Sequence, residues 1–130
     1  MANLTLAVLD GEYSIHSLPP NADIPTEVMA QPLYFIGKTQ DEVSILVPSS
    51  LPLVSDEVES GWKCLEVLGP LGFSMVGIMA RVSTTLANAN ISILAVSTFD
   101  TDYVFVKSQR LEEAAKALRS NSYQVLYPDK

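Results

Sequence analysis

The chain has 130 residues, a mass of 14.1 kDa, 48% hydrophobic residues and 18% charged residues. This balance excludes a disordered chain and predicts one compact domain or two very small ones. Fifteen acidic residues against eight basic ones give a net charge of −7 and a pI near 4.5, which argues against binding to nucleic acid or to an anionic membrane surface. No apolar run is long enough to span a bilayer and no secretory signal is recognisable, so we expect a cytoplasmic protein.

One histidine, His16, and one cysteine, Cys64, limit the chemistry that this chain can perform. Metal sites built from His and Cys need three or four such ligands, so we expect no metal and no cofactor. The glycine-rich loops that usually bind nucleotides are also absent from the sequence. A Cys–His pair would require His16 and Cys64 to meet in space, and no other nucleophile–base set stands out. We therefore expect a protein that is not an enzyme.

The first half of the chain is predicted to be rich in β-structure and carries most of the negative charge. Residues 1–60 hold nine acidic residues, one basic residue and six of the eight prolines. Asp10-Gly11 lies between two strand-like runs, which predicts a tight hairpin. A short helix and a second hairpin are expected to follow. The predicted elements are Leu4–Leu9, Glu12–Leu18, the helix Ile24–Ala30, and the strands Leu33–Lys38 and Val43–Val47.

A turn-rich, acidic segment separates the two halves. Pro48–Gly61 contains Pro, Ser, Asp and Gly at a density typical of a connection. We therefore predict two modules, residues 1–60 and 61–130, with a boundary near 56–61. No helix is predicted between Val47 and Trp62, so the first module is expected to be abbreviated.

The second half has a regular alternation of strands and helices. Its helices follow from apolar residues at three- and four-residue spacing, and its strands from short apolar runs between turn residues. The predicted elements are the strands Trp62–Leu68, Ile91–Phe99, Thr101–Lys107 and Ser122–Tyr127, and the helices Ser74–Ala89 and Leu111–Arg119. The order βαββαβ predicts an α+β, ferredoxin-like fold with both helices on one face of an antiparallel sheet.

Two segments of the second half carry the most characteristic pattern. Leu68–Ala80 is a glycine-bearing loop that opens a helix, and Ile91–Tyr103 contains Ile-Ser-Ile followed by Ser-Thr-Phe and Thr-Asp-Tyr. Together they resemble the ACT domain family, in particular the modules of aspartate kinases, of small bacterial proteins with two such modules in tandem, and of the eukaryotic cytosolic arginine sensor. The resemblance covers residues 62–127, and the first half resembles an abbreviated module of the same kind.

The resemblance implies regulatory binding of a free amino acid at an interface between two ACT modules, with no chemistry performed on the ligand. Free N–H groups and the dipole at the start of a helix suit the ligand carboxylate, and Asp100 or Asp102 at a strand end suits its ammonium group. By resemblance, Asp102 is favoured over Asp100. The candidate ligand-binding residues are Gly72, Phe73, Ser74, Met75, Thr98, Phe99 and Asp102.

Several candidates also have a purely structural interpretation. Gly72 and Asp100 are typical turn residues, and Asp102 is compatible with an exposed turn. For Met75 and Phe99, a core position is favoured over a position in a ligand pocket. The arginine sensor has an acidic residue where this chain has Met75, so the resemblance favours an uncharged or apolar amino acid here.

Two functions from different classes are therefore open. The leading hypothesis is a regulatory module that binds an amino acid, and the alternative is a structural or protein-interaction domain that has kept the fold without a ligand. We also expect a homodimer, because an ACT sheet has unpaired edges and an uncovered face. The helix Ser74–Ala89 supports this expectation, since Arg81 is its one charged residue. The partners expected are a small-molecule amino acid, a second copy and an unidentified regulated protein.

Overall fold

The computed structural model describes residues 4–69 and 75–128. Contacts between Cα atoms divide the chain into two compact units. The smaller unit is Gly11–Trp62, and the larger unit combines Met1–Asp10 with Lys63–Lys130. The N-terminal residues thus belong with the second half of the chain, whereas the division expected from the sequence assigned them to the first.

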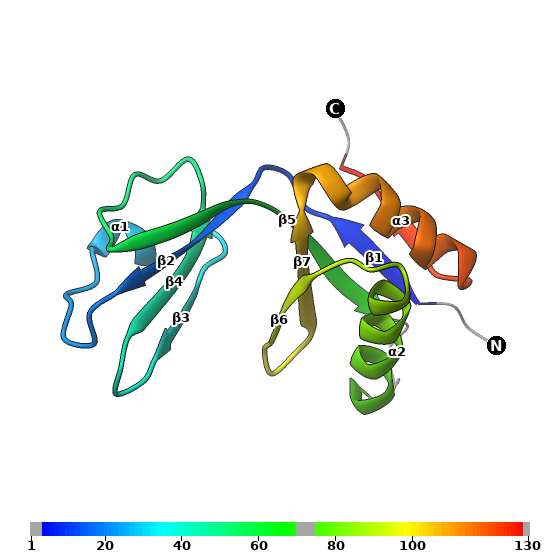
Figure 1. The fold of residues 1–130 in the computed structure, drawn as a ribbon, viewed down its shortest axis with the longest axis horizontal. Coiled ribbons are helices and arrows are strands. Elements are labelled where there is room, and N and C mark those ends of the chain that lie inside the picture. Colours follow the sequence, from blue (N-terminus) through cyan, green and yellow to red (C-terminus); the bar gives the residue numbers. More distant parts are fainter. Residues whose placement is uncertain (1–3, 70–74, 129–130) are drawn as a thin grey trace. The chain divides into compact units, whose positions relative to one another are not determined.

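Eight strands and three helices, with one short 3-10 turn, are present among the described residues (Figure 1). In the smaller unit they are β2 (Tyr13–Leu18), α1 (Thr26–Met29), β3 (Phe35–Lys38) and β4 (Val43–Pro48). The strand β5 (Glu57–Gly69) runs from the smaller unit into the larger one. The larger unit also holds β1 (Thr5–Val8), α2 (Met75–Asn88), β6 (Ile93–Ser97), β7 (Asp102–Lys107), the 3-10 turn η1 (Ser108–Arg110), α3 (Leu111–Ser120) and β8 (Gln124–Leu126).

The smaller unit is an antiparallel sheet with strand order β3-β4-β2-β5 and one short helix. Alternate residues of β2 and β4 point to the same face, where Leu18, Val43, Ile45 and Val47 form a buried cluster with Val28 of α1. Pro25 lies directly before α1, where its missing N–H has no cost. This unit confirms the predicted second hairpin, because β3 and β4 pair from Phe35↔Leu46 to Lys38↔Val43.

A loop takes the place of a second helix in the smaller unit. Leu51 and Leu53 from this loop pack against the buried cluster. Below it lies His16, whose Nδ1 is 2.9 Å from the Ser55 hydroxyl. Since the Ser55 hydroxyl itself donates to the Glu57 carbonyl at 3.1 Å, the imidazole donates from Nδ1. The expectation of an abbreviated first module, without a helix between Val47 and Trp62, agrees with the described residues.

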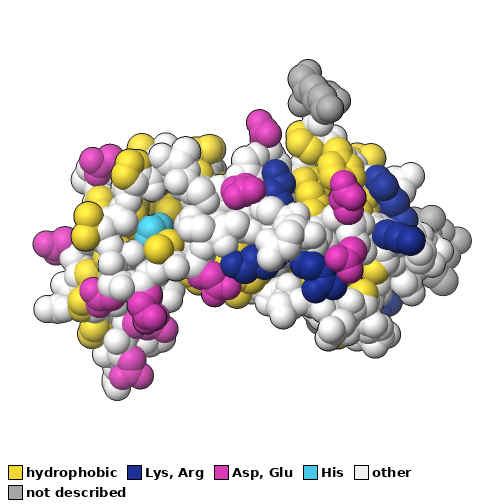
Figure 2. All heavy atoms as spheres, turned by 45° about the horizontal axis from the view of Figure 1, so that its top comes forward, with side chains coloured by type: hydrophobic (Ala, Val, Ile, Leu, Met, Phe, Trp, Pro, Cys, Tyr) yellow, Lys and Arg dark blue, Asp and Glu magenta, His cyan; other side chains and the backbone are white. Residues whose placement is uncertain are grey.

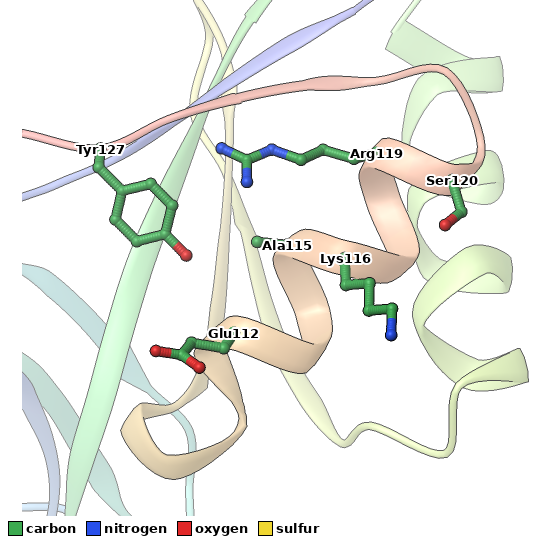
Figure 3. A pocket seen from close by; sticks show the side chains of 6 residues that line it. All are labelled: Glu112, Ala115, Lys116, Arg119, Ser120 and Tyr127. Atoms are coloured by element: carbon green, nitrogen blue, oxygen red, sulfur yellow. The ribbon is translucent and has the colours of Figure 1, made fainter.

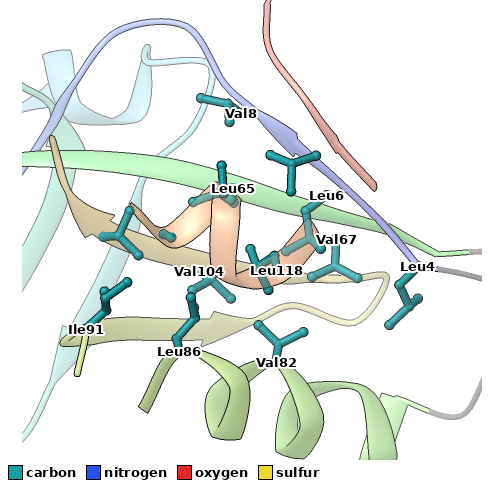
Figure 4. Close-up of a cluster of buried hydrophobic side chains, with 14 of the residues drawn as sticks. Leu4, Leu6, Val8, Leu65, Val67, Val82, Leu86, Ile91, Val104 and Leu118 are labelled. Atoms are coloured by element: carbon teal, nitrogen blue, oxygen red, sulfur yellow. The ribbon is translucent and has the colours of Figure 1, made fainter. Parts of the chain in front are cut away.

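The larger unit is a five-stranded sheet with strand order β6-β7-β5-β1-β8, and both of its longer helices lie on one face. Figure 4 shows the core between sheet and helices, to which Leu6, Leu65 and Val104 contribute from strands and Leu86 and Leu118 from α2 and α3. Without β1, the order would be that of the predicted βαββαβ fold, so the predicted fold class is confirmed. The strand β1 is inserted between the first and last strands, antiparallel to β5 and parallel to β8.

Two sequence predictions about the first half are wrong. The strand β1 does not form a hairpin with β2; it pairs with β5 and β8, while β2 pairs with β4 and β5. Gly11 still adopts a positive φ of 79°, so the Asp-Gly signal marked a turn correctly but not its strand partners. The predicted connection Pro48–Gly61 also extends too far, because the strand expected to begin at Trp62 already begins at Glu57.

Candidate functional site

The turn between β6 and β7 is held by the side chain of one threonine. The Thr98 hydroxyl accepts hydrogen bonds from the backbone N–H groups of Asp100 at 3.3 Å and Thr101 at 3.1 Å. The Thr98 N–H donates to the Thr101 carbonyl at 2.8 Å, and the Thr101 hydroxyl donates to the Val67 carbonyl on β5. The turn is therefore fixed both internally and to the neighbouring strand.

Directly after this turn, Asp102 is buried with an incomplete set of hydrogen bonds. Its relative exposure is 2%, and its Oδ2 atom has no hydrogen-bond partner among the residues that the structure describes. Asp102 shares a strand face with Val104 and Val106, which belong to the core beneath the helices. A carboxylate oxygen buried in this way carries a desolvation cost that a cationic group would offset.

The first turn of α2 lies at the same end of the larger unit's sheet as the β6–β7 turn (Figure 1). This follows from the topology, because β5 ends at Gly69 before α2 begins at Met75, and Val67 near that end of β5 accepts the Thr101 hydrogen bond. The start of a 14-residue helix and an unsatisfied carboxylate are thus placed at one edge of the fold.

The β3–β4 hairpin of the smaller unit repeats the β6–β7 hairpin with an offset of 59 residues. The pair Lys38↔Val43 corresponds to Ser97↔Asp102, and the register of every other pair printed for the first hairpin matches the second. The Thr39 hydroxyl accepts from the N–H groups of Asp41 at 3.1 Å and Glu42 at 3.2 Å, as Thr98 does in its own turn. The strands β4 and β7 have the same alternation of buried and half-buried residues.

The counterpart of Asp102 in this repeat is Val43, which is also 2% exposed. The fold therefore accepts an apolar residue at this buried position, and the carboxylate is not needed to form the turn. In contrast, Thr98 and Asp100 have identical counterparts in Thr39 and Asp41, so these two residues serve the turn. Of the residues in the hairpin, Asp102 is the one whose chemistry the fold does not explain.

The remaining predicted site residues have different outcomes. Gly72, Phe73 and Ser74 lie outside the described residues, and Met75 is the first residue of α2. Phe99 does not enter a core: it stands at the tip of the turn and is fully exposed. Asp102 is not the exposed turn acid of the structural alternative, since it is buried. The repeat itself was missed from the sequence, although Thr-x-Asp occurs at both Thr39 and Thr98.

Other chemistry-bearing side chains do not form a second site. Burial, together with the nearby Glu66 charge, raises the pKa of the Cys64 thiol to about 12, so it is protonated and unreactive at neutral pH. Burial lowers the pKa of His16 below its ordinary value, and its Nδ1 is occupied by Ser55. Among the described residues, no group of three His, Cys, Asp or Glu side chains is arranged to hold a metal ion. Within residues 4–69 and 75–128, no helix has the length and apolar character to cross a membrane.

Surface grooves also lie away from the predicted residues. One of about 550 Å³ runs along α3, lined by Glu112, Ala115, Lys116, Arg119, Ser120 and Tyr127. Figure 3 shows that Lys116 points away from Arg119, whose guanidinium group instead lies near the Tyr127 ring and donates to the Val125 carbonyl at 2.6 Å. The charged groups of Lys116 and Arg119 therefore do not point to a common binding position.

The second groove, of about 490 Å³, lies in the smaller unit and is acidic. Glu42, Glu57 and Glu59 line it, and the hydroxyls of Ser17 and Ser44 both donate to one oxygen of Glu42 at 3.2 and 3.1 Å. On the face drawn in Figure 2, the charged side chains of the smaller unit are acidic, whereas basic side chains lie on the larger unit, mixed with acidic ones. The smaller unit has eight acidic residues and one lysine, so its negative charge is a property of the whole unit.

Solved structures support the same fold. A protein of Agobacterium tumefaciens with a known crystal structure is 32% identical and has a TM-score of 0.89, over 100% of this chain and 97% of that chain. The ligand-free regulatory subunit of aspartate kinase from Thermus thermophilus is 12% identical and has a TM-score of 0.63, over 92% of this chain and 98% of that one. At that identity, the likeness to the aspartate kinase subunit concerns the fold alone.

Curated relatives match over part of their length. The cytosolic arginine sensor for mTORC1, subunit 1, of Homo sapiens is 36% identical over 73 residues, which is 55% of this chain and 22% of the sensor. The Mus musculus protein is 29% identical over 114 residues, which is 80% of this chain and 34% of the sensor. This chain thus spans about a fifth to a third of the length of these relatives.

The family model that matches the chain is described as an ACT domain, and the match covers residues 57–120. Those residues hold β5, α2, β6, β7 and α3, the elements around Asp102. The sequence motifs, the strand order of the larger unit and this match agree, and the chain belongs to the ACT domain family.

Proposed function

We propose that this protein is a non-catalytic regulatory module that binds a free amino acid through its larger unit, at an interface between ACT modules. The observation that carries the proposal is Asp102, a buried carboxylate whose Oδ2 has no partner within residues 4–69 and 75–128, at a position where the repeated hairpin has Val43. An amino acid brings the ammonium group that such a carboxylate needs. The match to ACT domains, regulatory in aspartate kinase, supports a regulatory role and indicates no catalytic family.

In this proposal the two charged groups of the ligand meet two different elements. The ammonium group binds Asp102, and the carboxylate binds backbone N–H groups at the start of α2, where the helix dipole favours an anion. Gly72, Phe73 and Ser74 precede the helix in the sequence and Met75 begins it. Phe99 at the turn tip covers the ligand, while Thr98 shapes the turn that carries Phe99.

We further propose an uncharged or apolar amino acid as the ligand. Met75 begins α2, and Met79, one turn later, packs against the core of the larger unit. The basic residue of α2 is Arg81, which has the wrong sign of charge for a cationic side chain. The named specificity of the arginine sensors is therefore not assigned to this chain.

The ligand site is completed by a second ACT module in a cytoplasmic homodimer. Two features of the larger unit support self-association. The strand β6 is an edge strand, and residues 90–99 around it contain no charged residue. An unprotected edge of this kind favours pairing with another chain. The regulated protein that reads the ligand is a further partner of this assembly.

A thermal-shift titration against the twenty amino acids tests the ligand proposal. At least one uncharged amino acid is expected to raise the melting temperature, because a ligand that binds the native state stabilises it. Asp102→Asn should abolish this shift, whereas Asp100→Asn, which changes the charge two residues away, should retain it. If no amino acid stabilises the protein, the alternative of a structural domain without a ligand is favoured; if Asp102→Asn still responds, Asp102 is not in the site.

Sedimentation equilibrium tests the homodimer. The expected result is a mass of twice 14.1 kDa at high protein concentration, with the dimer tightened by the amino acid that the thermal shift identifies. A monomer under both conditions would contradict the homodimer.

A further inference from the structure

The two hairpins provide a matched pair for asking what Asp102 does when no ligand is bound. Both β3 and β6 are edge strands that pair with one neighbour, β4 and β7 respectively. Both turns are closed by a threonine hydroxyl with the same hydrogen bonds. The buried residue after the turn is Val43 in one hairpin and Asp102 in the other. The change in local stability that Asp102→Val produces at this position thus reports on the carboxylate.

The buried carboxylate of Asp102 favours an opened hairpin end, whereas the buried side chain of Val43 favours a closed one. Val43 gains stability from its place in the buried cluster with Leu18 and Ile45. Asp102 has an Oδ2 atom without a partner among the described residues, and it regains hydrogen bonds when water reaches it. Water reaches Asp102 most easily when the adjoining end of the hairpin opens, because Ser97, its partner, lies on the edge strand.

We propose that the turn-proximal end of the β6–β7 hairpin is a ligand-controlled opening element, driven open by Asp102 and held closed by a bound cationic group. The opening breaks the Ser97↔Asp102 end of the ladder, while the hydrogen bonds of Thr98 keep the turn itself intact. The closing half of this inference rests on the proposed amino-acid site, since it takes the ligand ammonium as the cationic group. The other part of the inference, the opening of the hairpin end in the ligand-free protein, depends on Asp102 alone.

Opening and closing at this position allows ligand binding to change an interaction surface, the edge of β6. The strand β6 forms the edge of the larger unit's sheet, and it pairs along its whole length with β7 from Ile93↔Val106 to Ser97↔Asp102. When the Ser97 end leaves the ladder, the backbone groups presented at this edge change. A second chain that pairs with β6 therefore meets a complete edge in the bound state and a shortened one in the free state.

Amide hydrogen exchange on the full chain tests the inference, with the β3–β4 hairpin as the internal control. In the ligand-free protein, the amides of Asp102 and Tyr103, which lie outside the turn, should exchange roughly tenfold to a hundredfold faster than the corresponding amides of Val43 and Ser44. Asp102→Val, which installs the residue of the other hairpin, should bring the two rates together. Asp100→Asn should leave the difference unchanged, because this isosteric change keeps the backbone N–H of Asp100 that donates to the Thr98 hydroxyl.

The outcomes separate this inference from the proposed function. Equal exchange of the two hairpins in the wild type, or a difference that Asp102→Val does not remove, overturns the inference whether or not an amino acid binds. A difference that Asp102→Val removes but no amino acid reduces supports the opening half and overturns the amino-acid ligand. A difference in exchange rate that is removed both by Asp102→Val and by an amino acid supports opening by Asp102 and closing by the ligand.

Discussion

The two units of this chain build the same hairpin and use it differently. In the smaller unit the turn that begins at Thr39 is followed by Val43, and in the larger unit the turn that begins at Thr98 is followed by Asp102. The hydrogen bonds of the turn threonine, the register, and the burial of β4 and β7 are matched, so the backbone requirements of the turn are the same in both. Comparing the two hairpins distinguishes the residues that form the turn from Asp102, the residue that follows it. Neither hairpin alone would allow this distinction.

The units also differ around their hairpins. The larger unit has two long helices and the inserted strand β1, whereas the smaller unit has one short helix and a loop in the place of the second. The helix that precedes the hairpin, where the ligand site is proposed, is α2 with 14 residues in the larger unit and α1 with four residues in the smaller unit. A short helix before the hairpin and an apolar residue at the Asp102 position therefore both leave the smaller unit without the groups proposed to bind the ligand.

The comparison is tested most severely by giving the smaller unit the residue of the larger one. Val43→Asp should destabilise the protein by about 3–5 kcal/mol, because it buries a charge with no partner in a site that is now filled by a methyl-rich cluster. Urea denaturation followed by circular dichroism measures the change. Gln40→Asp adds the same charge at the exposed tip of the same turn and should cost little. Equal effects of the two variants would show that Val43 is not a desolvated position.

The inserted strand β1 is tested next. Leu6 is fully buried in the core of the larger unit, and Leu6→Ala should lower the free energy of unfolding by about 2–5 kcal/mol. Leu126 lies in the adjacent strand β8 and is half exposed, so Leu126→Ala serves as the control with an expected loss of about 0.5 kcal/mol or less. A small effect of Leu6→Ala would mean that β1 is an accessory to the ACT sheet rather than part of its core.

The smallest expected effect concerns the loop that replaces the second helix. Burial below this loop lowers the pKa of His16 from its ordinary value of 6.5. Below that pH the unfolded chain binds more protons at this residue than the folded one, so stability contributed by neutral His16 is lost as the pH falls through 6.5 toward the folded pKa. His16→Gln should flatten this part of the stability–pH curve. An unchanged curve would assign the pH dependence to other groups.

The sequence was sufficient for local structure and insufficient for strand partners. The hairpin around Thr39 and the helices of the second half follow from period and turn chemistry, and they were predicted. The partner of β1 was not, because Asp10-Gly11 favours a local hairpin, whereas the long strand β5 offers β1 and β2 consecutive places along its length. Long-range pairing of this kind is decided by the whole core and leaves no local signal.

The candidate site was predicted in part. Asp102 was selected by resemblance. Its spacing of two and four residues from Val104 and Val106 also indicated that it lies on the same face of the strand as these core residues. Its burial and the absence of an Oδ2 partner among the described residues depend on what surrounds it in space. The comparison with Val43 shows that the fold does not require a carboxylate at the Asp102 position. The repeated Thr-x-Asp at Thr39 and Thr98 would have indicated from the sequence that the two hairpins correspond.

The insertion of β1 has a consequence for how the protein is made. Thr5 and Gln124 are hydrogen-bonded neighbours although 119 positions separate them in the chain. During synthesis β1 emerges before the other elements of this fold, and its partner β8 emerges after them. The smaller unit draws its strands from a continuous stretch and can form early, while the larger unit waits for β8 to reach β1. Loop closure over such a distance makes folding slow. A newly made chain therefore spends time with one edge of β1 uncovered, a period in which a chaperone or a second nascent copy has access to it.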